Sequence, residues 1–154
     1  MTARSISAGD LDDPRVRAMI DLHVARARAE TGRGSDHAME ADELKSDAVD
    51  FWALWEGEAL IGLGALMEIA PGHGEIKSMH TAEAARRSGA GSAMLSHIVA
   101  AARERGYARL SLETGSWGYF VAARALYRAH GFEECGPFGD YVADRNSVFM
   151  TRTL

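Results

Sequence analysis

The sequence has almost no cysteine and no long hydrophobic run. Cys135 is the single cysteine among 154 residues, so an internal disulfide is excluded and we expect a reducing cytoplasm as the compartment. The longest apolar stretch, from Ala59 to Met67, is about half of what a membrane helix needs, and Glu68 ends it. Residues 1–10 also lack the apolar core of a signal peptide. These absences predict a soluble cytoplasmic protein that does not associate with a membrane.

Positive charge and metal-binding motifs are also scarce. Lysine and arginine number 17 against 22 aspartates and glutamates, which gives a net charge of −5. Proteins that bind nucleic acid rely on a basic surface to release counterions, so we expect no nucleic-acid partner. The histidines show no H-E-x-x-H spacing, and Cys135 has no partner cysteine. We therefore expect no metal site.

The composition that remains is that of a globular domain. Hydrophobic residues make up 47% of the chain and charged residues 25%, and both values are near the averages for globular proteins. A chain of this length can bury roughly two thirds of its unfolded surface, which is enough for an ordinary core. We expect a single domain over residues 1–154.

Hydrophobic periodicity predicts an α/β fold with a mixed central β-sheet flanked by helices, in the order β-α-α-β-β-β-α-β-α-β-β. A helix that connects two strands makes them parallel neighbours with a right-handed crossover, and this applies to the strands on either side of the third helix. The expected strands cover residues 4–8, 51–55, 59–69, 75–81, 107–113, 132–138 and 147–153, and the helices lie between Pro14 and Gly32, around 38–45, between Gly91 and Gly106, and over 119–130.

The turn before the third helix, Arg86-Arg-Ser-Gly-Ala-Gly-Ser92, is typical of a phosphate site. Glycines allow the backbone to approach a ligand, the first turn of a helix has unpaired amides, and arginines add positive charge. A nucleoside-triphosphate loop is excluded because no Gly-Lys-Ser/Thr occurs. A dinucleotide site is a rival, since Glu113 lies about 20 residues beyond the glycines, but Met94 replaces the third glycine of that motif.

Two motifs in neighbouring helices resemble a known family. Arg86-x-x-Gly89-x-Gly91 is similar to the coenzyme A pyrophosphate loop of the GNAT (Gcn5-related N-acetyltransferase) superfamily, and Ala125-Leu-Tyr-x-x-x-Gly-Phe132 is similar to its other recurrent signature. The resemblance covers nearly the whole chain, and shorter segments such as Leu112-Glu-Thr-Gly115 resemble a bacterial small-molecule subgroup. It implies a GNAT-like fold, acetyl-CoA as cosubstrate and no metal.

The resemblance also implies a set of cofactor contacts. A backbone amide near Met79 would hold the thioester carbonyl, and the same strand would pair with the pantetheine arm. Strand alternation puts Glu75, Lys77 and Met79 on one face of the sheet if no bulge intervenes. The implied coenzyme A contacts are Met79, His80, Thr81, Arg86, Arg87, Ser88, Gly89, Ala90, Gly91, Ser92, Thr114 and Tyr127.

Tyr127 and Glu75 are the predicted catalytic residues. The resemblance implies that Tyr127 faces the thioester sulfur. A thiol with a pKa of ~8.5 and a phenol with a pKa of ~10 make complete proton transfer to the thiolate uphill by about 2 kcal/mol, so a hydrogen bond is the expected role. An alkylamine arrives protonated and needs a base. Glu75 is the first candidate, directly or through water, and Glu68, His80 and Glu113 compete with it.

The sequence thus predicts an acetyl-CoA-dependent N-acetyltransferase that acts on a primary amine of a small molecule or peptide by direct attack in a ternary complex. Two alternatives stay open: a non-catalytic acyl-CoA sensor or interaction module, and a dinucleotide-binding protein. No residue pattern selects the acceptor. Many members of the family dimerise, so a homodimer is also an open alternative.

Overall fold

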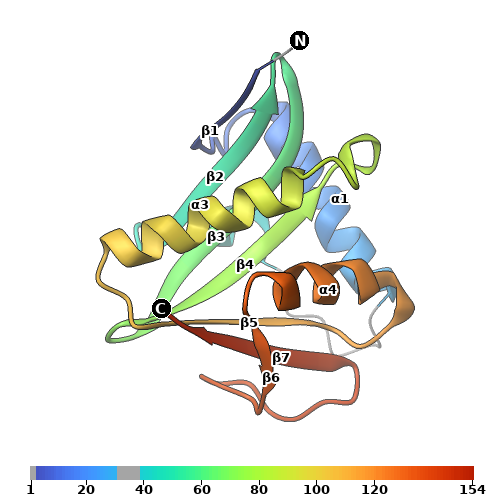
Figure 1. Cartoon of the computed structure of the whole chain (residues 1–154). Coiled ribbons are helices and arrows are strands. Elements are labelled where there is room, and N and C mark those ends of the chain that lie inside the picture. The colour runs from blue at the N-terminus through green and yellow to red at the C-terminus, as the bar shows by residue number, and fades with distance from the viewer. Residues whose placement is uncertain (1–2, 31–38) are drawn as a thin grey trace.

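A computed structural model describes residues 3–30 and 39–154. It contains a mixed sheet of seven strands in the order β1-β2-β3-β4-β5-β7-β6, with helices on both faces (Figure 1). The predicted fold class and order of elements are confirmed. The elements are β1 (Arg4–Ala8), α1 (Pro14–Glu30), α2 (Ala41–Leu44), β2 (Val49–Glu56), β3 (Ala59–Ala70), β4 (His73–Thr81), the 3₁₀ helix η1 (Glu83–Ala85), α3 (Ala90–Glu104), β5 (Arg109–Gly115), the 3₁₀ helix η2 (Gly118–Phe120), α4 (Val121–Ala129), β6 (Glu133–Cys135) and β7 (Ser147–Thr153).

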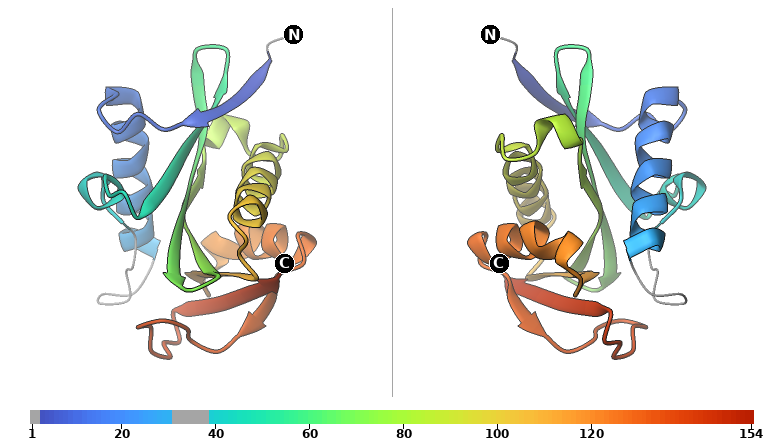
Figure 2. Two further views of the ribbon diagram at one scale, coloured as in Figure 1. Left: turned by 90° about the vertical axis from the view of Figure 1, so that its left-hand side faces the viewer. Right: turned by 90° about the vertical axis from the view of Figure 1, so that its right-hand side faces the viewer.

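Two hydrophobic cores lie on opposite faces of the sheet. Helices α1 and α2 cover one face, and α3 and α4 cover the other (Figure 2). In the helices the apolar residues repeat with helical spacing, and in the strands they alternate along the chain. These apolar faces pack against one another, as the patterns predict. The α1-side core includes Val16, Ile20, Leu44, Phe51 and Leu63. The α3-side core includes Leu66, Ile76, Met94, Ile98, Leu112, Tyr127 and Met150.

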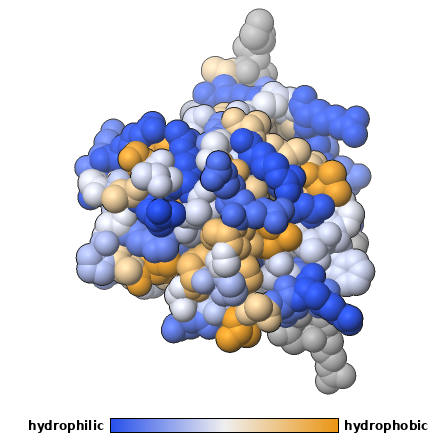
Figure 3. All heavy atoms as spheres, turned by 60° about the horizontal axis from the view of Figure 1, so that its bottom comes forward, coloured by the Kyte–Doolittle hydropathy of each residue, from blue (hydrophilic) through white to orange (hydrophobic). Residues whose placement is uncertain are grey.

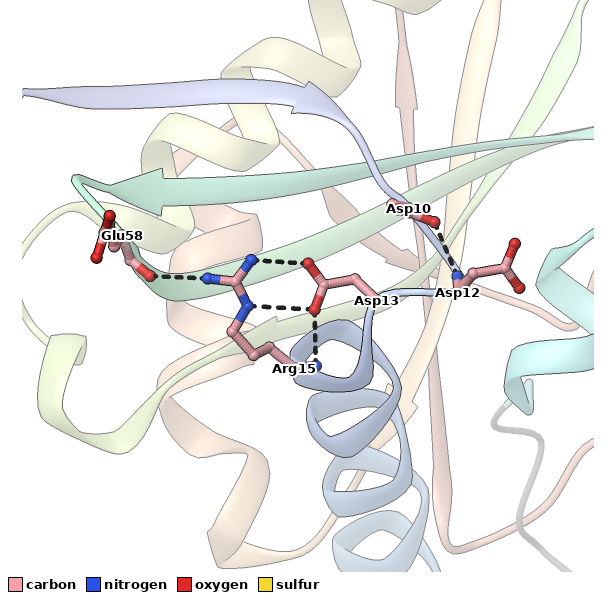
Figure 4. Close-up of polar contacts among 5 residues, drawn as sticks. All are labelled: Asp10, Asp12, Asp13, Arg15 and Glu58. Atoms are coloured by element: carbon pink, nitrogen blue, oxygen red, sulfur yellow. Dashed lines mark hydrogen bonds and ion pairs between the residues drawn. The ribbon is translucent and has the colours of Figure 1, made fainter.

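The beginning of α1 is fixed by short-range hydrogen bonds (Figure 4). The backbone N–H groups of Asp12 and Arg15 donate to Asp10 Oδ1 at 2.9 Å and Asp13 Oδ1 at 2.8 Å. The Arg15 guanidinium bonds Asp13 Oδ2 at 2.8 Å and reaches the Glu58 carbonyl at 3.4 Å, so the helix is attached to the β2–β3 turn. The helix begins at Pro14, as predicted, and Gly32, its expected end, lies outside the described residues.

Strands β4 and β5 are parallel neighbours, as the crossover rule predicts, but they pair over only part of their length. The register runs from His73 opposite Arg109 to Ile76 opposite Leu112. Beyond that point β4 continues to Thr81 and β5 to Gly115, and no further pairing between them is found in residues 39–154. The two strands therefore diverge, and we call the stretch in the middle of the sheet where their backbones are no longer paired the notch.

A β-bulge at Ser78 accompanies this divergence. The register with β3 shifts after Lys77, and Ser78 has a left-handed φ of 56°. The extra residue reverses the alternation that follows it. Met79 packs with Ile76 against the α3-side core, whereas His80 contacts α1. The expected grouping of Met79 with Glu75 and Lys77 is therefore wrong, because it assumed a strand without a bulge.

Several element boundaries differ from the predicted ones. The helix expected over 119–130 consists of the 3₁₀ helix η2 followed by α4, which ends at Ala129. The strand expected over 132–138 is limited to Glu133–Cys135, and Gly136 and Pro137, which follow it, are poor strand residues. Strand β4 begins at His73, two residues before the predicted start, because Pro71 and Gly72 alone form the turn after β3.

The surface is mixed in polarity. Figure 3 shows hydrophobic residues in separate patches between hydrophilic ones on the face turned to the viewer. The large apolar side chains that are exposed include Leu22, Trp117, Val121 and Val142, and isolated residues of this kind are ordinary on protein surfaces. Among the described residues, no helix combines the length and the apolar character that crossing a bilayer requires.

Candidate active site

A cleft of about 520 Å³ opens on the α3 side of the sheet, beside the notch between β4 and β5. Its walls come from the end of β4, the loop before α3, η2 and the inner face of α4. The two motifs that resemble the GNAT signatures therefore meet in one place. The lining residues are Met79, His80, Thr81, Arg86, Arg87, Gly89, Ala90, Gly91, Ser92, Tyr119, Phe120, Ala122, Ala123, Leu126 and Tyr127.

One end of the cleft is a cradle of backbone amides. Within the described chain, the N–H groups from Arg87 to Ser92 have no acceptor, and Gly89 at the N-cap of α3 supplies no side-chain bond. Left-handed φ values of 63° at Arg87 and 86° at Gly89 curve the loop. Backbone N–H groups in such a curve, at the positive end of a helix, form an anion site. The guanidinium groups of Arg86 and Arg87 add charge.

Two of the residues predicted to contact the cofactor do not line the cleft. Ser88 is in the loop, but its hydroxyl donates to the Ala85 carbonyl and accepts from Arg4, and the residue is not part of the cleft lining. Thr114 is buried in β5 opposite Val148 of β7 and does not line the cleft. Sequence reasoning placed both from their position in the motifs, which does not reveal where a side chain points.

Tyr127 forms the inner wall of the cleft. Its side chain is 7% exposed and its ring packs edge-on against Phe132, with centroids 6.0 Å apart. Burial, and to a smaller extent the negative charge of Glu113, raises the pKa of the Tyr127 phenol above its usual range. The phenol is therefore protonated at neutral pH and can act as a hydrogen-bond donor.

Helix α4, which carries Tyr127, is attached to the end of β5. Arg124 donates to the carbonyls of Gly115 at 2.6 Å and Trp117 at 3.1 Å. The ring of Phe120 lies on Gly115 so closely that a Cβ at this glycine would come within 2.0 Å of it. These contacts fix the start of α4 against the end of β5 and so determine the position of Tyr127 in the cleft wall.

Glu75 lies on the other face of the sheet, in a buried polar network that we call the Glu75 network, formed with Lys77 and Tyr141. Glu75 is 4% exposed, and its Oε2 accepts from Tyr141 Oη at 2.5 Å and Lys77 Nζ at 3.3 Å. Lys77 Nζ also donates to Tyr141 Oη at 3.0 Å. Burial first, and then the hydrogen bond to Glu75, raises the pKa of Tyr141.

Sequence reasoning missed Tyr141. It belongs to the loop between β6 and β7, 66 positions from Glu75, and no local pattern predicts that contact. The sequence signal was weak: an aromatic residue stands between Asp140 and Asp144.

The competing bases differ in their surroundings. Glu113 accepts from Ser147 Oγ at 3.0 Å. His80 Nδ1 lies 3.2 Å from His23 Nδ1, and burial first, then His23, lowers the pKa of His80 to about 4. Glu68 is exposed near the end of β3. In the described part of the chain, no group of three or more His, Cys, Asp or Glu side chains could hold a metal ion.

Comparison with known proteins identifies the family. The model of the acetyltransferase (GNAT) family matches residues 16–132. The N-acetyltransferase YsnE of Bacillus subtilis, itself uncharacterised, is 44% identical over 149 residues, 97% of this chain and 99% of its own. The uncharacterised N-acetyltransferase YedL of Escherichia coli is 42% identical over 97% of this chain and 94% of its own.

A solved structure shows the same fold. A candidate acyl-CoA N-acyltransferase of Klebsiella pneumoniae superposes with a TM-score of 0.79 at 26% identity, over 98% of this chain and 97% of that one. The chain belongs to the GNAT family of acetyltransferases, whose donor is an acyl-CoA.

Proposed function

We propose that the chain transfers an acetyl group from acetyl-CoA to a primary amine of a small molecule or peptide, by direct attack in a ternary complex. The observation that carries this proposal is the arrangement of the cleft: a cradle of unpaired amides at one end and Tyr127 in its inner wall. A phosphate group at the cradle and a thioester at Tyr127 are the two ends of one acyl-CoA molecule.

The residues that would hold the donor follow from this arrangement. The free amides from Arg87 to Ser92, together with Arg86, suit the pyrophosphate oxygens. The unpaired edge of β4 beyond Ile76 suits the amides of the pantetheine arm, which would pair with it as an added strand does. A backbone N–H near the bulge at Ser78 would stabilise the negative charge that develops on the thioester oxygen.

Tyr127 would donate a hydrogen bond to the leaving thiolate. Its raised pKa makes complete transfer of the proton even less favourable than for an ordinary phenol. A hydrogen bond that forms as negative charge develops on sulfur stabilises the transition state more than the ground state, which is what raises kcat.

Glu75 is our proposed base for the amine proton. It lies in β4, next to the notch, and on the face of the sheet opposite α3 and α4, so an amine that enters from that face meets the thioester across the strand edge. Its Oε2 is already bonded to Tyr141 and Lys77, so the proton would arrive at Oε1 or through water. Glu113 is the second candidate.

Initial-rate kinetics test the proposal. Thiol release is measured while acetyl-CoA and an amine are varied together, across a panel of amino acids, polyamines and peptides. We expect amine-dependent release and intersecting double-reciprocal plots, as direct attack requires. Parallel plots would indicate a covalent acetyl-enzyme and contradict direct attack, and tight acetyl-CoA binding without release for any amine would favour the sensor. Calorimetry with NADH, for which we expect no heat of binding, closes the dinucleotide alternative.

A further inference from the structure

The loop that forms the amide cradle is held from behind by the first strand. Arg4, at the start of β1, lies 84 positions from Ser88 and donates to it twice: Nη1 to the Ser88 carbonyl at 3.0 Å and Nη2 to Ser88 Oγ at 2.9 Å. Its Nε faces Glu56 Oε1 at 3.5 Å, which orients the guanidinium. In both views of Figure 2, β1 crosses above the N-terminal end of α3.

Ser88 has no hydroxyl proton left for a phosphate. A serine hydroxyl has one proton to donate, and that of Ser88 is directed at the Ala85 carbonyl. Phosphate oxygens at neutral pH are acceptors, so the hydroxyl as it stands cannot donate to one. The polar contacts of the Ser88 side chain face Ala85 and Arg4 instead of the cleft.

The conformation of the loop needs such support. Ser88 lies between Arg87 and Gly89, which both have left-handed φ values. That conformation costs a non-glycine residue such as Arg87 roughly 1 kcal/mol, and it persists only where the surroundings fix it. Two hydrogen bonds from Arg4 and one to Ala85 fix the single residue between the two left-handed positions.

We propose that Arg4 is a positioning residue that holds the phosphate-binding loop, through Ser88, in the conformation that presents its amides to coenzyme A. The proposal rests on the proposed use of acetyl-CoA as donor. A loop ordered before binding does not lose conformational entropy when the ligand arrives, so its affinity is higher. The contact of Arg4 would thus set the affinity for the phosphates and leave the chemistry at Tyr127 unchanged.

The test compares Arg4→Gln with the natural chain, with two ligands: coenzyme A and S-acetylpantetheine, which lacks the phosphates. We expect the Kd for coenzyme A to rise about 5- to 20-fold, as loss of one or two hydrogen bonds to a charged group predicts. The KM for S-acetylpantetheine should change by less than about twofold, because this ligand has no phosphate that the loop could bind. The kcat at saturating acetyl-CoA should also change by less than about twofold, because Arg4 does not act on the chemistry at Tyr127.

Three further variants separate positioning from charge. Arg103→Gln removes the same charge from the last turn of α3, at the end away from the loop, and should leave the Kd for coenzyme A unchanged. Arg4→Lys keeps the charge but cannot make two parallel bonds, so it should bind nearly as weakly as Arg4→Gln. Ser88→Ala should weaken binding, and the double variant Arg4→Gln/Ser88→Ala should be less than additive, because both act on one contact.

The outcomes are distinguishable. A natural chain that binds no coenzyme A overturns the proposed function and this inference with it. If the natural chain binds but Arg4→Gln binds equally well, only the inference fails. The inference also fails if, in Arg4→Gln, the KM for S-acetylpantetheine rises as much as the Kd for coenzyme A, because that result indicates a general loss of structure. It fails as well if Arg4→Lys binds coenzyme A with full affinity, because the positive charge alone would then be sufficient.

Discussion

At the scale of single residues, Tyr127 in the wall of the cleft is the proposed hydrogen-bond donor to the leaving thiolate. Changing Tyr127 to Phe keeps the ring that packs on Phe132 and removes only the phenol. We expect kcat to fall about 10- to 100-fold, since a hydrogen bond to a developing charge is worth roughly 1.5–3 kcal/mol, with little change in the KM for acetyl-CoA. Tyr107→Phe, outside the cleft at the end of α3, is the matched control. Unchanged turnover in Tyr127→Phe would disprove the assigned role.

Glu75→Gln tests the base. Removal of a general base typically costs 10²- to 10⁴-fold, and we expect a loss of kcat in that range, measured on protein whose circular dichroism is unchanged. Glu113→Gln, which leaves the Glu75 network intact, is expected to keep most of the activity. The reverse ranking of the two variants would move the base to Glu113.

His80 predicts a pH dependence of stability. Burial first, and then His23, lowers its folded pKa to about 4, whereas an unfolded histidine titrates near ~6.5. Between these values the unfolded chain binds more protons, so the free energy of unfolding is highest above about pH 6.5 and falls as the pH drops through the window. We expect a loss of about 1–2 kcal/mol from this group at about pH 5.

Urea unfolding at several pH values measures this contribution. The natural chain should lose stability more steeply than His80→Gln as the pH falls from about 7 to 5, because only in the natural chain does unfolding expose the His80 imidazole, which then takes up a proton. Identical slopes for the two proteins would mean that His80 is not held neutral in the folded state.

At the scale of elements, the start of α3 is what makes the cradle. Gly89 and Gly106 flank α3, both have left-handed φ values (86° and 76°), and a Cβ at either would meet nothing within 4 Å. Replacing either by alanine should therefore cost a similar 1–2 kcal/mol of stability. Only Gly89→Ala should weaken binding of coenzyme A, because only Gly89 shapes the cradle. Calorimetry and thermal unfolding measure both effects, and equal affinities for the two variants would argue against the cradle.

Local patterns predicted the elements well, and contacts between distant segments account for what they missed. The helical spacing of apolar residues in α3 and the apolar runs of β4 and β5 predicted the parallel crossover. All three patterns lie within about 40 consecutive residues. The bulge at Ser78 results from pairing with β3, and the contacts of Glu75 with Tyr141 and of Ser88 with Arg4 join segments 66 and 84 positions apart. Single-sequence periodicity carries no information on such pairs.

At the scale of the whole molecule, the sheet separates two environments. The donor cleft lies on the side of α3 and α4, and the Glu75 network lies on the opposite face. Between them, the pairing of β4 with β5 ends at Ile76 opposite Leu112. In the reaction that we propose, the acyl donor and the amine would enter from different faces of the sheet and meet at the edge of β4 in a ternary complex.

The most direct test of this account is mass spectrometry of products formed from acetyl-CoA and a metabolite extract. The account predicts at least one amine whose mass increases by one acetyl group, with an equal amount of free coenzyme A, and a large loss of that product in Tyr127→Phe. Coenzyme A that binds in the cleft while no amine in the extract becomes acetylated would contradict the account.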